Sequence, residues 1–282
     1  RVDKSTLSQQ TLMELVVAKI AQPNRIGSLD SPIHQWNFVT LNDRAEVTEI
    51  HWSELWLTGS FSFQWLPETL QELHIRENRL DGTLDCATLP QSLVYLDVSV
   101  NTLHGSLDLQ RLPKGIRNVD LSENTFSGAV SLKGLPGTLE TLYIGINSLS
   151  GSLNLETLPP ALKEFSLCEN EFSGEVSLTH LPKSLEILTM DVNSFSGKLD
   201  LTRLSNGMKE LYLSSNKFEG ETDFSQLPES LKVLEITNLS ITGEIFTPNN
   251  ETQYEMLEDY EGLFVDATNS DGVRVHRGKQ QK

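Results

Sequence analysis

The sequence predicts a solenoid, in which short similar coils stack on one another, and three observations support this prediction. Asparagine recurs every 23 residues, and a glycine follows four positions after each asparagine. A Leu-Pro pair keeps the same step, with Leu204-Ser205 as the one substitution. Such a period indicates coils that cannot bury an apolar face alone and therefore stack on their neighbours. The repeated asparagines, which we expect to be structural, are Asn78, Asn101, Asn124, Asn147, Asn170, Asn193 and Asn216.

Residues 1–46 lack the repeat and are predicted to form an N-terminal cap. Apolar residues fall near helical spacing over residues 7–20 and Pro23 stops the run, which indicates an amphipathic helix. Trp36 and Phe38 are two residues apart, as on an edge strand. Helix and strand would together cover the end of the first coil, where a parallel sheet otherwise exposes its edge.

Residues 112–134 illustrate one repeat of the solenoid, which we expect to span residues 47–248 with nine strands. Val119 and Leu121 alternate with polar neighbours, the pattern of a short strand with one side facing water. Asn124 then ends the strand, because its side chain can satisfy backbone groups that a tight turn would leave unpaired. Stacked copies of this residue would form a ladder along the solenoid.

The two ends of the solenoid depart from the pattern. Leu55 and Leu239 occupy the asparagine position in the first and last repeats, as in capping repeats. Residues 249–282 are predicted to form a C-terminal cap and a polar tail. Tyrosine and leucine spaced by three indicate a short helix within residues 251–262, and the chain from Thr268 onward is expected to be a mobile tail.

The repeated pattern L-x-L-x-x-N-x-[LF]-x-G-x-[LV] resembles the leucine-rich repeat family. The F-S-G element, as in Phe126-Ser127-Gly128, is similar to repeats of plant receptors, whereas L-P-x-S-L is similar to those of protozoa such as kinetoplastids. The resemblance implies an α/β-type solenoid, a horseshoe with a parallel concave β-sheet of about nine strands and an irregular convex side. It also implies that the concave face binds other proteins.

Composition excludes several classes of partner. Lys and Arg number 22 against 39 Asp and Glu, a formal charge of −17 that repels nucleic acids and anionic lipid. No apolar run reaches the length of about 18 residues that crosses a bilayer, so we expect no membrane insertion. A basic partner is compatible with this charge, and the sequence does not predict an oligomeric state.

The cysteines favour a reducing compartment. Cys86 replaces a core leucine of the repeat, and Cys168 falls in a strand position shared with Ser99 and expected to face solvent, so the two should not be bonded. This pattern favours a cytoplasmic location. The sequons that begin at Asn238 and Asn250 leave a secreted or cell-surface location open.

Outward strand positions carry the candidate binding residues. One column reads His51, His74, Asp97, Asp120 and Tyr143, and it continues to Tyr212 and Glu235. Carboxylates outnumber basic residues on these positions, which favours a docking face, although an acidic protein can also carry a merely solvated one. The partner-binding residues that we predict are His74, Tyr95, Asp97, Asp120, Glu123, Tyr143, Ile187 and Tyr212.

The sequence gives little support to chemistry on this face. His51 and His74 with Glu49 or Glu72 could bind a divalent metal, but an open sheet offers no second layer of ligand contacts, so we predict no metal and no cofactor. No nucleophile elbow, phosphate-binding loop or C-x-x-C motif occurs, and we expect no enzyme activity. The leading prediction is a scaffold that binds a protein or peptide. The alternatives are a secreted or cell-surface recognition protein for a host or matrix ligand, and a structural spacer.

Overall fold

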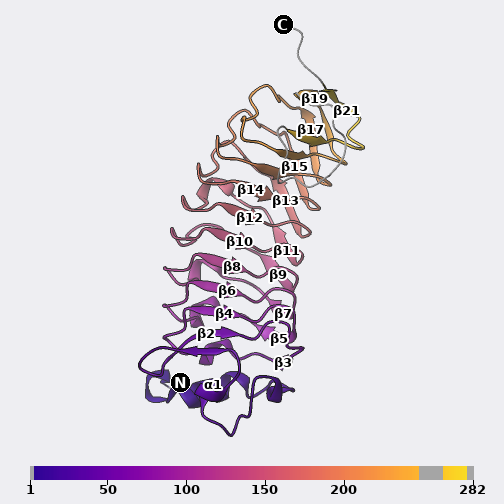
Figure 1. The fold of residues 1–282 in the computed structure, drawn as a ribbon. Helices are drawn as coiled ribbons and strands as arrows, with labels where there is room; N and C mark the ends of the chain where they lie inside the picture. Colours follow the sequence, from indigo (N-terminus) through magenta and orange to yellow (C-terminus); the bar gives the residue numbers. More distant parts are fainter. Residues whose placement is uncertain (1–2, 248–262, 278–282) are drawn as a thin grey trace. The chain divides into compact units, whose positions relative to one another are not determined.

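The structure, a computed structural model, describes residues 3–247 and 263–277. The chain forms two compact units, Arg1–Leu149 and Ser150–Lys282. In both units a coil gives one strand to the ladder that contains β2 or β12, here called the main sheet, and one strand to a second ladder (Figure 1). This arrangement confirms the predicted solenoid.

Unit 1 contains the N-terminal cap and the first coils. The main sheet here consists of β1 (Val39–Leu41), β2 (Val47–His51), β4 (Glu72–His74), β6 (Tyr95–Asp97), β8 (Asn118–Asp120) and β10 (Thr141–Tyr143), in this order. The second ladder consists of β3 (Thr58–Ser60), β5 (Arg79–Thr83), β7 (Thr102–Gly105) and β9 (Thr125–Ala129). Short 3-10 helices on the connections are η4 (Phe63–Trp65), η5 (Cys86–Thr88) and η6 (Leu109–Arg111). Apart from β1, which is antiparallel to β2, the strands are parallel.

Unit 2 repeats the same design. Its main-sheet strands are β12 (Glu164–Ser166), β14 (Ile187–Thr189), β16 (Glu210–Tyr212), β18 (Val233–Glu235) and β20 (Phe264–Asp266). Its second ladder contains β13 (Glu171–Glu175), β15 (Ser194–Gly197), β17 (Lys217–Glu221), β19 (Ser240–Thr247) and β21 (Gly272–Arg277). The junction of the two units carries β11 (Ser148–Gly151), and η7 (Leu155–Thr157) follows it. In the core of this unit the rings of Phe172, Phe195 and Phe218 stack in a row, with centroids 6.2 and 6.4 Å apart.

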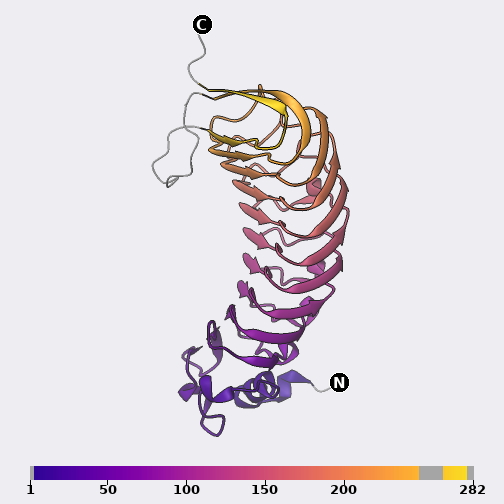
Figure 2. The ribbon, with the colours of Figure 1, turned by 90° about the vertical axis from the view of Figure 1, so that its right-hand side faces the viewer.

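The N-terminal cap closes the first coil of unit 1. Its elements are η1 (Lys4–Thr6), α1 (Gln9–Val17), η2 (Pro23–Arg25) and η3 (Ile33–Gln35). The apolar face of α1 is buried, and the indigo N-terminal segment lies against the first coil (Figure 2). Glutamine side chains complete the closure, because Gln9 Oε1 accepts from the amide of Val47 and Gln22 Oε1 from that of Thr58.

The predicted edge strand of the cap is shifted along the chain. Trp36 is buried and its ring lies 6.5 Å from that of Trp52, while Phe38 is exposed with a φ of 61°. The strand itself, β1, begins only at Val39. Two aromatic residues two positions apart therefore mark the turn into β1 and not the strand.

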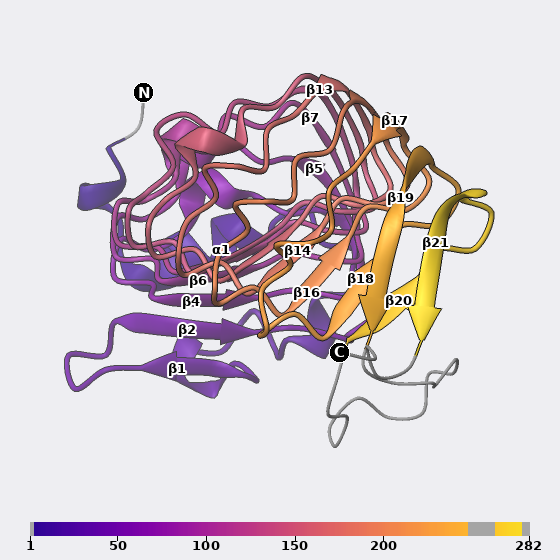
Figure 3. The ribbon, with the colours of Figure 1, turned by 90° about the horizontal axis from the view of Figure 1, so that it is seen from above.

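The C-terminal end differs from the predicted polar tail. Residues 268–277 are not a tail, because β21 pairs in parallel with β19 over six residues, and β20 adds a tenth parallel strand beside β18 (Figure 3). Ser270 is buried in this coil, where its Oγ donates to the carbonyl of Ile236 and accepts from the amide of Leu239. A serine thus takes the place of the asparagine. The predicted capping helix at 251–262 lies outside the described residues.

The asparagine ladder is present as predicted. Asn101 is representative: its Nδ2 donates to the carbonyls of Ile75, Val98 and Ser99, and its Oδ1 accepts from the amide of Leu80. One side chain therefore ties its own turn to the coil before it. Asn78, Asn101 and Asn124 are buried, while the four later members are half-buried.

The residue before each asparagine adopts a left-handed conformation. In unit 1 the φ of Val100 is 53° and that of Ile146 is 52°; in unit 2 that of Val192 is 52°. This region is strained for β-branched side chains, which collide with their own backbone there. Every turn of the repeat thus requires a left-handed residue that the sequence pattern does not reveal.

Candidate functional site

The outward side of the main sheet in unit 1 carries two neighbouring columns of side chains. Strand register pairs His51 with His74, His74 with Asp97, Asp97 with Asp120, and Asp120 with Tyr143. The adjacent column holds Glu49, Glu72, Tyr95, Asn118 and Thr141, which are also paired in register. We refer to these two columns together as the unit 1 face.

Three rings of the unit 1 face form a continuous stack. The rings of His51 and His74 lie 4.4 Å apart and are nearly parallel, with an angle of 14° between their planes. The ring of His74 stacks in turn on that of Tyr95, again at 4.4 Å. The 23-residue repeat places these residues on neighbouring strands, but it did not predict that Tyr95 crosses from its own column to reach His74.

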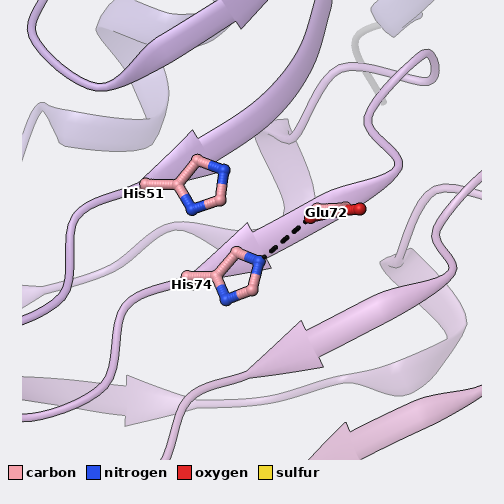
Figure 4. A group of neighbouring side chains, drawn as sticks. All are labelled: His51, Glu72 and His74. Atoms are coloured by element: carbon pink, nitrogen blue, oxygen red, sulfur yellow. Dashed lines mark hydrogen bonds and ion pairs between the residues drawn. The ribbon is translucent and has the colours of Figure 1, made fainter.

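Each histidine of the stack contacts a carboxylate of its own strand. His51 Nε2 lies 3.3 Å from Glu49 Oε2, and His74 Nε2 lies 3.2 Å from Glu72 Oε2 (Figure 4 shows the second pair). Residues two apart on a strand point to the same side, which explains these contacts. Each histidine is therefore paired with a glutamate of its own strand.

Asp97 and Asp120 are less accessible than predicted. Asp97 is only 5% exposed, and its Oδ1 accepts from the amide and hydroxyl of Ser99. Asp120 is half-buried and bonds Ser122 in the same way. Burial raises the pKa of Asp120 above its usual value, opposed by the bonds from Ser122. Asp97 is therefore a poor contact residue, contrary to the prediction that it lies exposed.

The other predicted residues of unit 1 lie closer to solvent. Tyr95 and Tyr143 are half-buried and Glu123 is exposed. Burial also raises the pKa of the Tyr95 hydroxyl, so this group stays protonated at neutral pH. Glu123 stands at one of the left-handed positions, with a φ of 52°, at the strand exit next to Asp120.

Two predicted residues belong to unit 2. Ile187 pairs in register with Glu210, and Tyr212 pairs with Thr189 on the next strand. Both side chains are half-buried, and the Tyr212 hydroxyl donates to Glu210 Oε2 at 2.8 Å. They form a second, separate group of candidate contacts.

Basic residues beside the strands are tied to carboxylates. Arg117 Nη1 lies 2.6 Å from Glu140 Oε1, Lys209 Nζ lies 2.6 Å from Glu186 Oε2, and Arg76 pairs with Glu77. These pairs run between neighbouring coils or neighbouring residues. They neutralise part of the acidic surplus, so fewer carboxylates are left to attract a partner than the sequence count indicates.

The cysteines are unpaired, but neither has the properties of a reactive thiol. Cys86 is buried, and burial raises the pKa of its thiol to about 12. Cys168 is half-buried, and its pKa is also raised by burial. The position that Cys168 shares with Ser99 is therefore not the open one that we predicted. Within residues 3–247 and 263–277 there is also no helix of the length and apolar character that a bilayer span requires.

Comparison with known proteins identifies the fold. No protein-family model matches the sequence, and no curated protein does. Among solved structures, the crystal structure of PEPR1–AtPEP1 superposes with a TM-score of 0.69 at 21% identity, over 84% of this chain and 35% of that chain. A plant ice-binding protein superposes with a TM-score of 0.65 at 20% identity, over 84% of this chain and 80% of that chain. The shared fold is the leucine-rich repeat solenoid that the sequence motif predicts.

Proposed function

We propose that this protein is a non-catalytic scaffold that binds a protein or peptide on the outward side of the main sheet. The observation that carries the proposal is the stack of His51, His74 and Tyr95 on the unit 1 face, beside the carboxylates of Glu49 and Glu72. Flat, half-exposed rings next to charges are typical of the anchors of protein interfaces. The PEPR1–AtPEP1 structure shows a protein of this fold together with a partner, which supports partner binding as the function.

The charge of the face favours a basic partner. Glu49, Glu72 and Glu123 have side chains at or near the surface of unit 1, and the chain carries a net charge of −17. An acidic surface attracts a basic ligand from a distance, and salt weakens this attraction. We therefore propose a peptide with lysine or arginine, whose side chains can also stack on the Tyr95 ring.

A peptide library tests this function. We would select a phage-displayed library on the immobilised full chain and measure the selected peptides against Tyr95→Ala, Tyr143→Ala and Lys133→Ala. Lys133 is the control, because it is exposed on the connection that follows the second ladder of unit 1. Loss of an interface anchor costs more than about 1 kcal/mol, so each tyrosine variant should raise the Kd at least about fivefold, whereas Lys133→Ala should leave it unchanged.

Two further measurements sharpen this test. Tyr95→Phe keeps the ring that stacks on His74 and should bind nearly as well as the wild type. The selected peptides should be basic and should bind more weakly at high salt. Peptides whose Kd is the same for both tyrosine variants as for the wild type would contradict the proposal, and so would a library that yields no binder. Either result would favour a structural spacer.

A secreted or cell-surface recognition protein remains the alternative. The comparisons give no support to the cytoplasmic location that the unpaired cysteines favoured. Asn238 begins one sequon and is exposed, so a glycan has access to it. A glycan on Asn238 in the protein from its native source, seen by mass spectrometry, would establish the secretory route, and its absence would favour the cytoplasm.

A further inference from the structure

We propose that His51, His74 and Glu72 form a binding site for a single transition-metal ion of the zinc class. The site goes beyond the proposed peptide binding and does not depend on it. It revises the prediction from sequence, which placed no metal on the open sheet. The ligand atoms of the three residues all lie within 4.8 Å of one another.

The backbone fixes the positions of the two histidines. They are paired in register on β2 and β4, which are hydrogen-bonded neighbours, and their rings project from the same side of the sheet (Figure 4). A tetrahedral zinc ion with Zn–N distances of about 2.0–2.1 Å needs its two nitrogens about 3.3 Å apart. Since neighbouring strands are about 4.8 Å apart, a small rotation of the more exposed His51 side chain brings the nitrogens to this separation.

The carboxylates supply both charge and further ligands. Glu49 and Glu72 are paired in register, an arrangement of like charges that destabilises a sheet. Each already lies within 3.3 Å of a histidine nitrogen. A divalent ion bound by the two histidines would reduce the repulsion and accept the carboxylate of Glu72, while Glu49 stays outside the group of three ligands. Two imidazoles and a carboxylate suit zinc, copper or nickel, whereas magnesium prefers oxygen ligands alone.

The structure also supplies the support that a flat sheet was expected to lack. The ring of Tyr95 stacks on His74 at 4.4 Å and restricts its rotation. The side chain of His74 is only 21% exposed, whereas those of His51 and Glu72 are 44% and 43% exposed. One ligand is thus held in place and the others close onto it, so the ion keeps at least one position open to water.

Calorimetric titration of the full chain, without a histidine tag, with zinc chloride tests this site. We expect one ion per chain, with a Kd raised at least about tenfold by His51→Ala or by His74→Ala. His180→Ala is the matched control. His180 Nδ1 also lies 3.3 Å from a glutamate, Glu156, but among the described residues it belongs to no group of three possible ligands. Magnesium chloride at the same concentration should give no heat of binding.

A second measurement separates loss of ligands from loss of fold. Zinc should raise the melting temperature of the wild type and of His180→Ala but not of the two site variants, whose melting temperatures without metal show whether they fold. Absence of zinc binding to the wild type at millimolar concentration would overturn the proposal. Equal weakening by His180→Ala would also overturn it, since zinc would then bind surface histidines without selection.

Discussion

The asparagine ladder and the unit 1 face lie a few residues apart in the same coils, yet they follow opposite rules. The ladder repeats one residue because each side chain bonds backbone groups, which are the same in every coil, as Asn101 does. The face varies from histidine to aspartate to tyrosine because its contacts between coils are made by side chains, as in the stack of His51, His74 and Tyr95, and not by a repeated bond to the backbone. The residues at the repeated position therefore stabilise the fold, and this leaves the outward column free for recognition.

The largest effect should follow from a change in the ladder. Asn101→Ala removes four hydrogen bonds to the backbone, at a buried site, and should lower the free energy of unfolding by about 2 to 3 kcal/mol. Urea denaturation measures this change. Asn118→Ala is the control from the face: its Nδ2 donates to Thr141 Oγ1, and its loss should cost less than about 0.5 kcal/mol. Equal losses in the two variants would contradict the comparison.

A smaller effect, of opposite sign, is expected at the left-handed positions beside the ladder. Val192 has a φ of 52° and is 47% exposed, and the equivalent residue two coils later is Asn238. Asparagine tolerates this conformation, so Val192→Asn should raise the free energy of unfolding by about 1 kcal/mol. Ile187→Asn, at an ordinary strand position, should give no gain. A stabilised Ile187→Asn would show that exposure of apolar surface, not backbone strain, is the cause.

The smallest effect concerns the pH dependence of the face. The pKa of Asp120 is raised by burial above the value of 3.8, so the folded protein binds this proton more tightly than the unfolded chain does. The stability that the proton contributes is present below pH 3.8 and is lost as the pH rises through the raised pKa. Asp120→Asn avoids this loss. At pH 7 its free energy of unfolding should therefore be higher than that of the wild type, by about 1 kcal/mol or less.

Denaturation of both proteins from about pH 3 to about pH 7 measures this difference. The difference in the free energy of unfolding should nearly vanish at about pH 3, because the wild-type carboxyl is protonated there. The side-chain amide oxygen introduced by Asp120→Asn can still accept from Ser122, so loss of these bonds is not the cause of a change. A difference that stays constant over the whole range would show that the charge of Asp120 does not matter.

The sequence predicted the structure best where a residue makes the same local contacts in every coil. The period of the asparagines and glycines located every main-sheet strand from β2 to β18, and α1 was evident from its apolar spacing. The last coil was not predicted from the sequence, because residues 248–262 interrupt the period and Ser270 replaces the asparagine. The Ser270 hydroxyl bonds the equivalent carbonyl, that of Ile236, but it accepts from the amide of Leu239 and not from the amide two residues later, and nothing in the repeat marks this serine as equivalent.

The residues of the face were recognised in part. Register follows from the repeat, so the order His51, His74, Asp97, Asp120 could be written down from the sequence. The burial of Asp97 could not be predicted from the sequence, because it depends on the bond to Ser99 and on the packing of its neighbours. The stack of His74 on Tyr95 depends likewise on side-chain rotation across two columns.

The sequence by itself determined the coil, its period and the direction in which each strand residue points, because these follow from local backbone geometry and from a repeated hydrogen-bonding residue. Only the tertiary structure decided which outward side chains meet, since contacts such as that of His51 with His74 join residues 23 positions apart. It also decided how much water reaches Asp97, Asp120 and Cys168. Burial and contact are properties of neighbouring coils taken together, and no single repeat contains them.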